Sequence, residues 1–153
     1  MGPKGLRELA IQIAVILAAR FEGLVLVPYR CAAGVPTIGY GATYYPNGRR
    51  VKLTDPPITK EFAQQMLVWM VTHIYLPKVV KLCPGISTPE RLAAIIDFTF
   101  NLGAGNLQAS TLRKRINQGR WDLAKVELMR WVRAGGRVLK GLIRRREAEA
   151  ALI

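Results

Sequence analysis

The chain has 153 residues and a formal net charge of +13, and half of its residues are hydrophobic. This length suits one domain, or two small lobes with a common core. Two cysteines and one histidine exclude a disulfide framework and argue against a metal site or a histidine-based triad. The charge indicates a polyanionic partner, which composition alone leaves open as nucleic acid, an anionic membrane or an anionic cell envelope.

Residues 4–21 are predicted to form a helix. Its run from Leu9 to Ala19 is apolar but too short to cross a bilayer, which needs roughly 20 apolar residues. Basic residues precede the run and small residues follow it, as in a signal peptide. The acidic residue Glu8 at the start of the run counts against a signal peptide. We therefore favour a buried core helix, although secretion remains open.

The next part of the chain predicts a small antiparallel sheet. Residues 24–30, 35–40 and 50–53 alternate in polarity or are β-branched, and glycine, proline and asparagine separate them. Pro28 and Pro36 cannot donate to a neighbouring strand, so these strands are expected at edges or with irregular pairing.

A helix is then expected to start after Thr59 as its N-cap and to run toward Pro77. Its apolar residues, including two methionines, recur at helical spacing and therefore predict core positions rather than a cofactor site. His73 lies on this helix without an evident partner, so a structural or exposed role is favoured over a catalytic one.

The remaining sequence is predicted to be helical. The expected helices start at the caps Ser87 and Ser110, at Trp121 and at Lys140, and end at Gly103, Gln118, Val132 and Leu152. Trp121 and Trp131 are expected to be core aromatics.

Basic residues concentrate in this last part. Between Arg113 and Arg146 twelve Lys or Arg residues stand against two acids, which accounts for +10 of the +13. Solvated helix faces explain much of this pattern, but the excess of one sign predicts attraction to an anionic surface. An amphipathic C-terminal helix could also perturb anionic lipid.

The most informative stretch is residues 22–43. Glu22 follows the first helix, Cys31 stands after eight intervening residues, and Thr37 after five more, within Thr-Ile-Gly-Tyr-Gly. This stretch resembles the catalytic segment of the phage-type lysozymes, or endolysins, of the T-even and lambdoid phages. That family spaces its site as Glu, eight residues, Asp or Cys, five residues, Thr. The segment Phe98–Gly103 and the C-terminal pattern around Arg144 and Arg145 resemble the family as well.

The resemblance implies an α+β, mostly helical lysozyme-like fold in one domain spanning 1–153. Residues 1–58 would form the N-terminal helix and a small antiparallel β lobe. Residues 59–82 would form a long linking helix, and residues 83–153 a helical lobe.

It also implies hydrolysis of the β-1,4 bond between N-acetylmuramic acid and N-acetylglucosamine in peptidoglycan, with inversion and without a cofactor. Glu22 would be the general acid, with Cys31 and Thr37 positioning the water, and Phe100 and Asn101 would line the substrate groove. Cys31 stands where the T-even relatives have Asp, and a thiol is a poorer acceptor, so its role as base is open.

A structural alternative pairs Glu22 with Arg137 or Arg145, and an arginine there could also position the acid. Some relatives use disulfide exchange for regulation, and Cys83 could be a partner for Cys31.

The expected enzyme is a monomer made in the infected host cytoplasm that acts in the periplasm, on peptidoglycan and with no specific nucleic acid. Two other functions compete with it. One is a cationic membrane-disrupting protein with a vestigial site, and the other is a basic nucleic-acid-binding protein, which only the charge supports.

Overall fold

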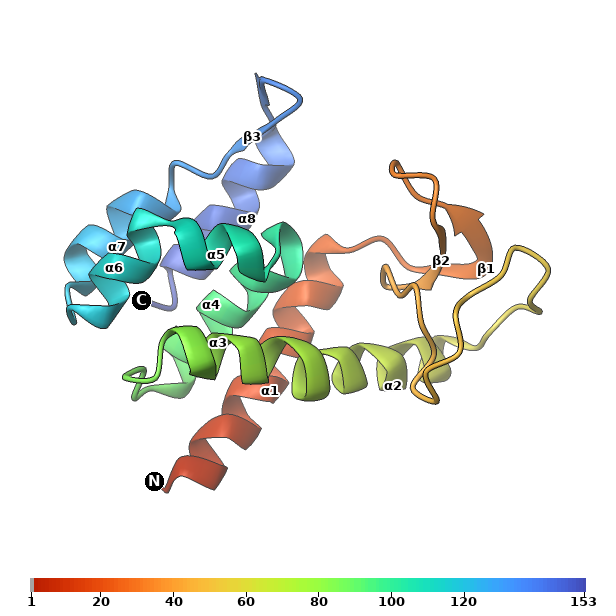
Figure 1. The fold of residues 1–153 in the computed structure, drawn as a ribbon, viewed down its shortest axis with the longest axis horizontal. Coiled ribbons are helices and arrows are strands. Elements are labelled where there is room, and N and C mark those ends of the chain that lie inside the picture. Colours follow the sequence, from red (N-terminus) through yellow and green to blue (C-terminus); the bar gives the residue numbers. More distant parts are fainter. Residues whose placement is uncertain (1) are drawn as a thin grey trace.

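The computed structural model describes residues 2–153 and has two lobes joined by a long helical segment (Figure 1). A group of helices forms the larger lobe, and a short hairpin with its loops forms the smaller one. This arrangement confirms the predicted α+β, mostly helical fold with a small antiparallel β lobe. No helix among the described residues is both long and apolar enough to cross a membrane.

Helix α1 (Pro3–Phe21) runs through the centre of the molecule and packs along α4 (Pro89–Leu102). It buries the small residues Ala10, Ala14 and Ala18 together with Leu17, whereas Ile16 on the other face is 72% exposed. The expectation of a core helix is therefore confirmed for one face. Small side chains at this interface allow the two helices to approach closely.

The smaller lobe contains β1 (Val25–Arg30) and β2 (Pro36–Gly39), which pair antiparallel with Tyr29 opposite Thr37. The predicted strand at 50–53 is wrong, because only an isolated bridge between Tyr44 and Arg50 forms there. The Asp55 carboxylate accepts a hydrogen bond of 2.8 Å from the Lys52 backbone N–H and folds the segment into a turn.

The linking segment consists of α2 (Lys60–Met70), the π-helical turn η1 (Val71–Tyr75) and α3 (Leu76–Leu82). Thr59 caps α2 as predicted by accepting from the Phe62 N–H at 3.0 Å. The helical segment continues past Pro77 to Leu82. The π-helical turn η1 directly precedes Pro77, and such a widened turn accommodates a residue that has no N–H to donate.

The larger lobe continues after α4 with four more helices and a short hairpin. These are α5 (Ala104–Ala109), α6 (Thr111–Asn117), α7 (Trp121–Leu128), β3 (Arg133–Ala134), β4 (Arg137–Val138) and α8 (Lys140–Ala150). The hairpin projects from the lobe in Figure 1. Ser110 caps α6 as predicted, and both Trp121 and Trp131 pack against the core.

Two predicted boundaries in this lobe are wrong. The cap of α4 is Thr88 instead of Ser87, since its hydroxyl accepts from the Arg91 N–H at 3.3 Å. Helix α7 ends at Leu128 instead of Val132, because the chain turns there into the β3–β4 hairpin, whose tip is formed by Gly135 and Gly136 at positive φ.

Candidate active site

Glu22 stands where α1 ends and the chain turns toward the β lobe. It is the C-cap residue, in an extended conformation, and its N–H donates to the Ala18 carbonyl at 2.8 Å. Its side chain is 26% exposed. A carboxyl group at this place is held by a rigid helix and still reaches solvent.

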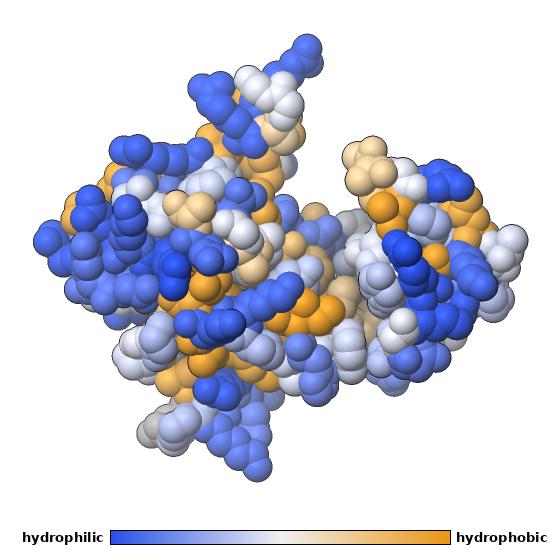
Figure 2. All heavy atoms as spheres, in the orientation of Figure 1, coloured by the Kyte–Doolittle hydropathy of each residue, from blue (hydrophilic) through white to orange (hydrophobic). Residues whose placement is uncertain are grey.

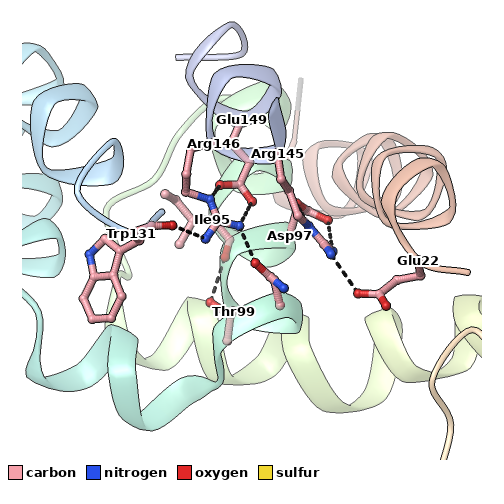
Figure 3. A network of polar contacts seen from close by, with 9 residues as sticks. Glu22, Ile95, Asp97, Thr99, Trp131, Arg145, Arg146 and Glu149 are labelled. Carbon is pink, nitrogen blue, oxygen red and sulfur yellow. Dashed lines mark hydrogen bonds and ion pairs between the residues drawn. The ribbon is translucent and has the colours of Figure 1, made fainter. Parts of the chain in front are cut away.

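The Glu22 carboxylate is bound by Arg145 of α8, whose Nη1 lies 2.8 Å from Oε1. Of the two arginines considered for this pairing, Arg145 is therefore the partner, and Arg137 is exposed on β4. The same Arg145 also makes two hydrogen bonds of 2.9 Å to Asp97 of α4, so it joins three helices (Figure 3). Burial opposes its charge, but the contacts with Asp97 and then Glu22 raise the pKa of Arg145 above its ordinary value.

Beside this ion pair lies a pocket of about 370 Å³. It is lined by Phe21, Glu22, Asn101, Leu139, Gly141, Leu142 and Arg145. The structure therefore brings Asn101, which the resemblance assigned to the substrate groove, to the same pocket as Glu22. Phe100 does not line it. Its ring packs against Tyr75 instead, at 4.9 Å between centroids.

Tyr75 brings the linking segment to the same site. Burial first, and then the charge of Glu22, raises the pKa of Tyr75. The end of α1, the π-helical turn η1 and the end of α4 therefore meet around Glu22, where the two lobes join.

Cys31 and Thr37 lie together at the hairpin of the β lobe. The turn from Cys31 to Val35 brings Thr37 opposite Tyr29, and the Thr37 hydroxyl donates to the Val35 carbonyl at 2.8 Å. Hydrogen bonds from the Val35 backbone, then Ala33 and then Thr37, lower the pKa of the Cys31 thiol. The Thr37 hydroxyl has one proton, so its bond to the Val35 carbonyl competes with donation to the thiol. Cys31 is half-buried, whereas Thr37 is only 2% exposed.

The five predicted site residues thus fall into three places. Glu22 and Asn101 share the pocket, Cys31 and Thr37 share the hairpin without lining that pocket, and Phe100 packs beside Tyr75. The space-filling view shows this face of the molecule hollowed between the larger lobe and the β lobe (Figure 2).

Sequence reasoning missed the buried charges behind Glu22. Asp97, Arg146 and Glu149 are all 0% exposed, and Arg146 binds Glu149 at 2.7 Å and Asn101 at 2.7 Å. One signal was available, because Asp97 interrupts an otherwise apolar stretch in the middle of a predicted buried helix.

The other predicted features are resolved as follows. Cys31 and Cys83 are both free thiols, and burial raises the pKa of Cys83 to about 11. His73 is exposed and stacks near Trp69. Across residues 2–153 no three His, Cys, Asp or Glu side chains gather in a way that could hold a metal ion.

The basic region is only partly a surface feature. Its exposed members on α6, α7, the β3–β4 hairpin and α8 are Lys114, Arg120, Lys125, Arg130, Arg133, Arg137, Lys140 and Arg144. Arg145 and Arg146, which were counted with them, are buried in ion pairs. The inner face of α8 is therefore ionic at these positions.

Comparison with known proteins shows that this chain is similar to phage lysozymes and endolysins. The family model described as phage lysozyme matches residues 19–149. An endolysin of Acyrthosiphon pisum secondary endosymbiont phage 1 is 35% identical over 144 residues, covering 90% of this chain and 92% of that protein.

Two solved structures have the same fold. The endolysin from Escherichia coli O157:H7 phage FAHEc1 superposes with a TM-score of 0.79 at 32% identity, covering 92% of this chain and 90% of that chain. The muramidase domain of SpmX from Asticaccaulis excentricus superposes with a TM-score of 0.76 at 30% identity, covering 91% of this chain and 92% of that chain.

Proposed function

This chain belongs to the phage lysozyme family and is a peptidoglycan-hydrolysing endolysin, and from this premise we propose that Glu22 is its general acid. The bond cleaved is the β-1,4 linkage between N-acetylmuramic acid and N-acetylglucosamine. Glu22 protonates the leaving oxygen, because a carboxylic acid beside the scissile bond is the group that glycoside hydrolysis requires.

The observation that carries this proposal is the placement of Glu22. Its carboxyl group lines a pocket of about 370 Å³ at the end of a rigid helix, and Arg145 holds one oxygen at 2.8 Å. The other oxygen has no protein partner among the described contacts, and it is the one available to a glycosidic oxygen.

The β hairpin supplies the second half of the mechanism. Cys31 and Thr37 position the attacking water on the face opposite the leaving group, which gives inversion. The lowered pKa of Cys31 makes its sulfur a better acceptor than an ordinary thiol, because a larger share is thiolate at a given pH. The Thr37 hydroxyl donates its hydrogen bond to the Val35 carbonyl and so holds the turn that carries Cys31. The lone pairs of the same hydroxyl oxygen stay free to accept a hydrogen bond from the water.

Asn101 contributes to the substrate groove directly, and Phe100 contributes to it from behind. Arg146 Nη2 donates a hydrogen bond to Asn101 Oδ1 at 2.7 Å. The side-chain NH₂ of Asn101 is therefore the group left to donate to a sugar oxygen. Phe100 acts one step away, since its ring supports Tyr75 next to Glu22.

The protein acts as a monomer on peptidoglycan, made in the infected host cytoplasm and working in the periplasm. The exposed basic residues of α6, α7, the hairpin and α8 draw it to the anionic envelope and to anionic outer-membrane lipid. Because electrostatic attraction between exposed charges is screened by salt, this binding should weaken as ionic strength rises.

The test is the loss of turbidity of outer-membrane-permeabilised Gram-negative cells. Wild type should lyse them, Glu22→Gln should not, and Glu8→Gln, which changes an exposed Glu on the same helix, should match wild type. Analysis of the sugar ends that are released identifies the bond.

Equal lysis by wild type and Glu22→Gln would assign killing to the cationic surface acting on membranes. Folded wild type that neither lyses cells nor releases sugar ends would contradict the enzyme altogether.

A further inference from the structure

Asp97 is a fully buried carboxylate for which the mechanism above has no use. It lies on α4 with 0% exposure, and both of its oxygens accept from Arg145, Oδ2 from Nε and Oδ1 from Nη2, each at 2.9 Å. A buried charge is strongly unfavourable unless it is paired, and a two-bond contact to a guanidinium is the tightest pairing available to it.

The guanidinium of Arg145 is planar, so its hydrogen bonds have fixed relative directions. Asp97 takes the edge formed by Nε and Nη2, and the remaining Nη1 points at Glu22 Oε1 at 2.8 Å. Figure 3 shows Arg145 between the two carboxylates. The position of Asp97 therefore sets where Arg145 can hold Glu22.

We propose that Asp97 is a positioning residue for the general acid Glu22. Asp97 orients Arg145 and offsets part of the positive charge of Arg145. This inference rests on the proposed function of Glu22. Asp97 touches neither the pocket nor the reacting atoms, and it acts only through Arg145.

The charge offset follows from what a general acid needs. Glu22 must carry a proton when it meets the glycosidic oxygen, and a lone cation at 2.8 Å would favour the carboxylate instead. Asp97 places a negative charge on the opposite edge of the same cation. The net field that Arg145 exerts on Glu22 is thereby reduced, while its hydrogen bond to Glu22 is kept.

The other titratable groups around this pair come from each neighbouring element. Tyr75 of η1 feels the charge of Glu22, and Arg146 of α8 feels those of Asp97 and Arg145. Glu149 of α8 lies against Arg146, and burial first and then the neighbouring Asp97 raise its pKa. On α1, Arg20 stacks on Phe21, over which Arg145 also lies. Asp97 is the acid that contacts Arg145 on the side away from Glu22.

The experiment is the pH profile of Asp97→Asn on purified peptidoglycan, followed by release of reducing ends. Asn keeps the shape and one acceptor oxygen but removes the negative charge. Activity of a general acid falls as pH rises past its titration, so the alkaline limb of kcat should move to lower pH by about one unit. At pH values above the alkaline limb, kcat of Asp97→Asn should therefore be about tenfold lower than that of wild type, and lowering the pH should restore it. KM should be nearly unchanged, because Asp97 does not touch substrate.

Asp122→Asn is the matched control. It makes the same chemical change in an aspartate that also pairs with an arginine, Arg120 at 3.1 Å, but on the exposed surface. Its profile should coincide with that of wild type. A folded Asp97→Asn enzyme whose alkaline limb also coincides with wild type would overturn the inference.

Asp97→Glu keeps the test decisive if the Asn variant does not fold. This variant retains the negative charge but displaces the Arg145 guanidinium from Glu22, so kcat should fall several-fold and the alkaline limb should not move to lower pH. A limb that moves to lower pH in Asp97→Glu would overturn the charge argument. Glu22→Gln separates the two levels, because its full activity refutes the acid itself, whereas an inactive Glu22→Gln with an unshifted Asp97→Asn refutes only the role of Asp97.

Discussion

The ion pair between Arg146 and Glu149 offers a sharp test of how this fold is held together. Both side chains are 0% exposed, with Nε and Oε1 at 2.7 Å and Nη2 and Oε2 at 2.9 Å. Glu149→Ala leaves the Arg146 guanidinium buried with Asn101 at 2.7 Å and a long contact of 3.5 Å to the Trp131 carbonyl. Removing one partner of a buried pair costs about 3–5 kcal/mol.

That cost is a large share of the total stability of a domain, which is about 5–15 kcal/mol. With a urea m-value of about 2 kcal/mol/M, the midpoint of unfolding should fall by about 1.5–2.5 M. The melting temperature should fall by about 6–20 °C, from about 2–4 °C per kcal/mol at this size. Urea titrations followed by far-UV circular dichroism measure the change directly.

Glu127→Ala is the control for this prediction. Glu127 also pairs with an arginine three residues away, Arg130 at 3.6 Å, but that arginine is 72% exposed. A surface pair of this kind contributes about 0–1 kcal/mol, so its removal should barely move the midpoint. If Glu149→Ala unfolded at the same urea concentration as Glu127→Ala, the idea that the buried pair holds α8 in place would be wrong.

Three further predictions follow from local contacts. Hydrogen bonds from the Lys52 N–H first, and then from Tyr45 and Arg49, lower the pKa of Asp55 to about 2. Its pKa in the unfolded chain is about 3.9, so its contribution to stability is present above about pH 4 and is lost as pH falls through about 2. The urea midpoints of wild type and Asp55→Asn should therefore converge on acidification. Thr88→Ala should cost about 1 kcal/mol and Ser87→Ala almost nothing, because only Thr88 caps α4. Iodoacetamide should label Cys31, with its lowered pKa, at a lower pH than Cys83, whose pKa is about 11, and mass spectrometry of the two peptides decides this.

Local patterns predicted the elements of this fold well where local physics decides the outcome. The helical period around Met66 and Met70 and the hydroxyl of Thr59 act within a turn, so α2 could be located from sequence. The errors lie where a distant or neighbouring contact competes. Residues 50–53 have strand-like composition, but the Asp55 carboxylate captures the Lys52 N–H and makes a turn.

The candidate site was predictable only in part for a similar reason. The spacing of Glu22, Cys31 and Thr37 is a property of one segment and can be read directly from the chain. The pairing of Arg145 with Glu22 crosses 123 positions and that with Asp97 crosses 48, and no local pattern selects Arg145 over Arg137. Burial does select it, because an arginine on the inner face of α8 must find carboxylates there.

The buried charges also explain why α8 can place two arginines in the interior. Arg145 and Arg146 stand against Asp97, Glu149 and the half-exposed Glu22, so the group is neutral when one of the three acids carries a proton. Burial first, and then the neighbouring carboxylate of Asp97, raises the pKa of Glu149 well above its ordinary value, although Arg146 opposes this. Because the folded state binds a proton at Glu149 more tightly than the unfolded chain does, the stability should be greatest below about pH 4.3 and should decline as pH rises toward the folded pKa of Glu149. Glu149→Gln mimics the protonated form and should remove that decline.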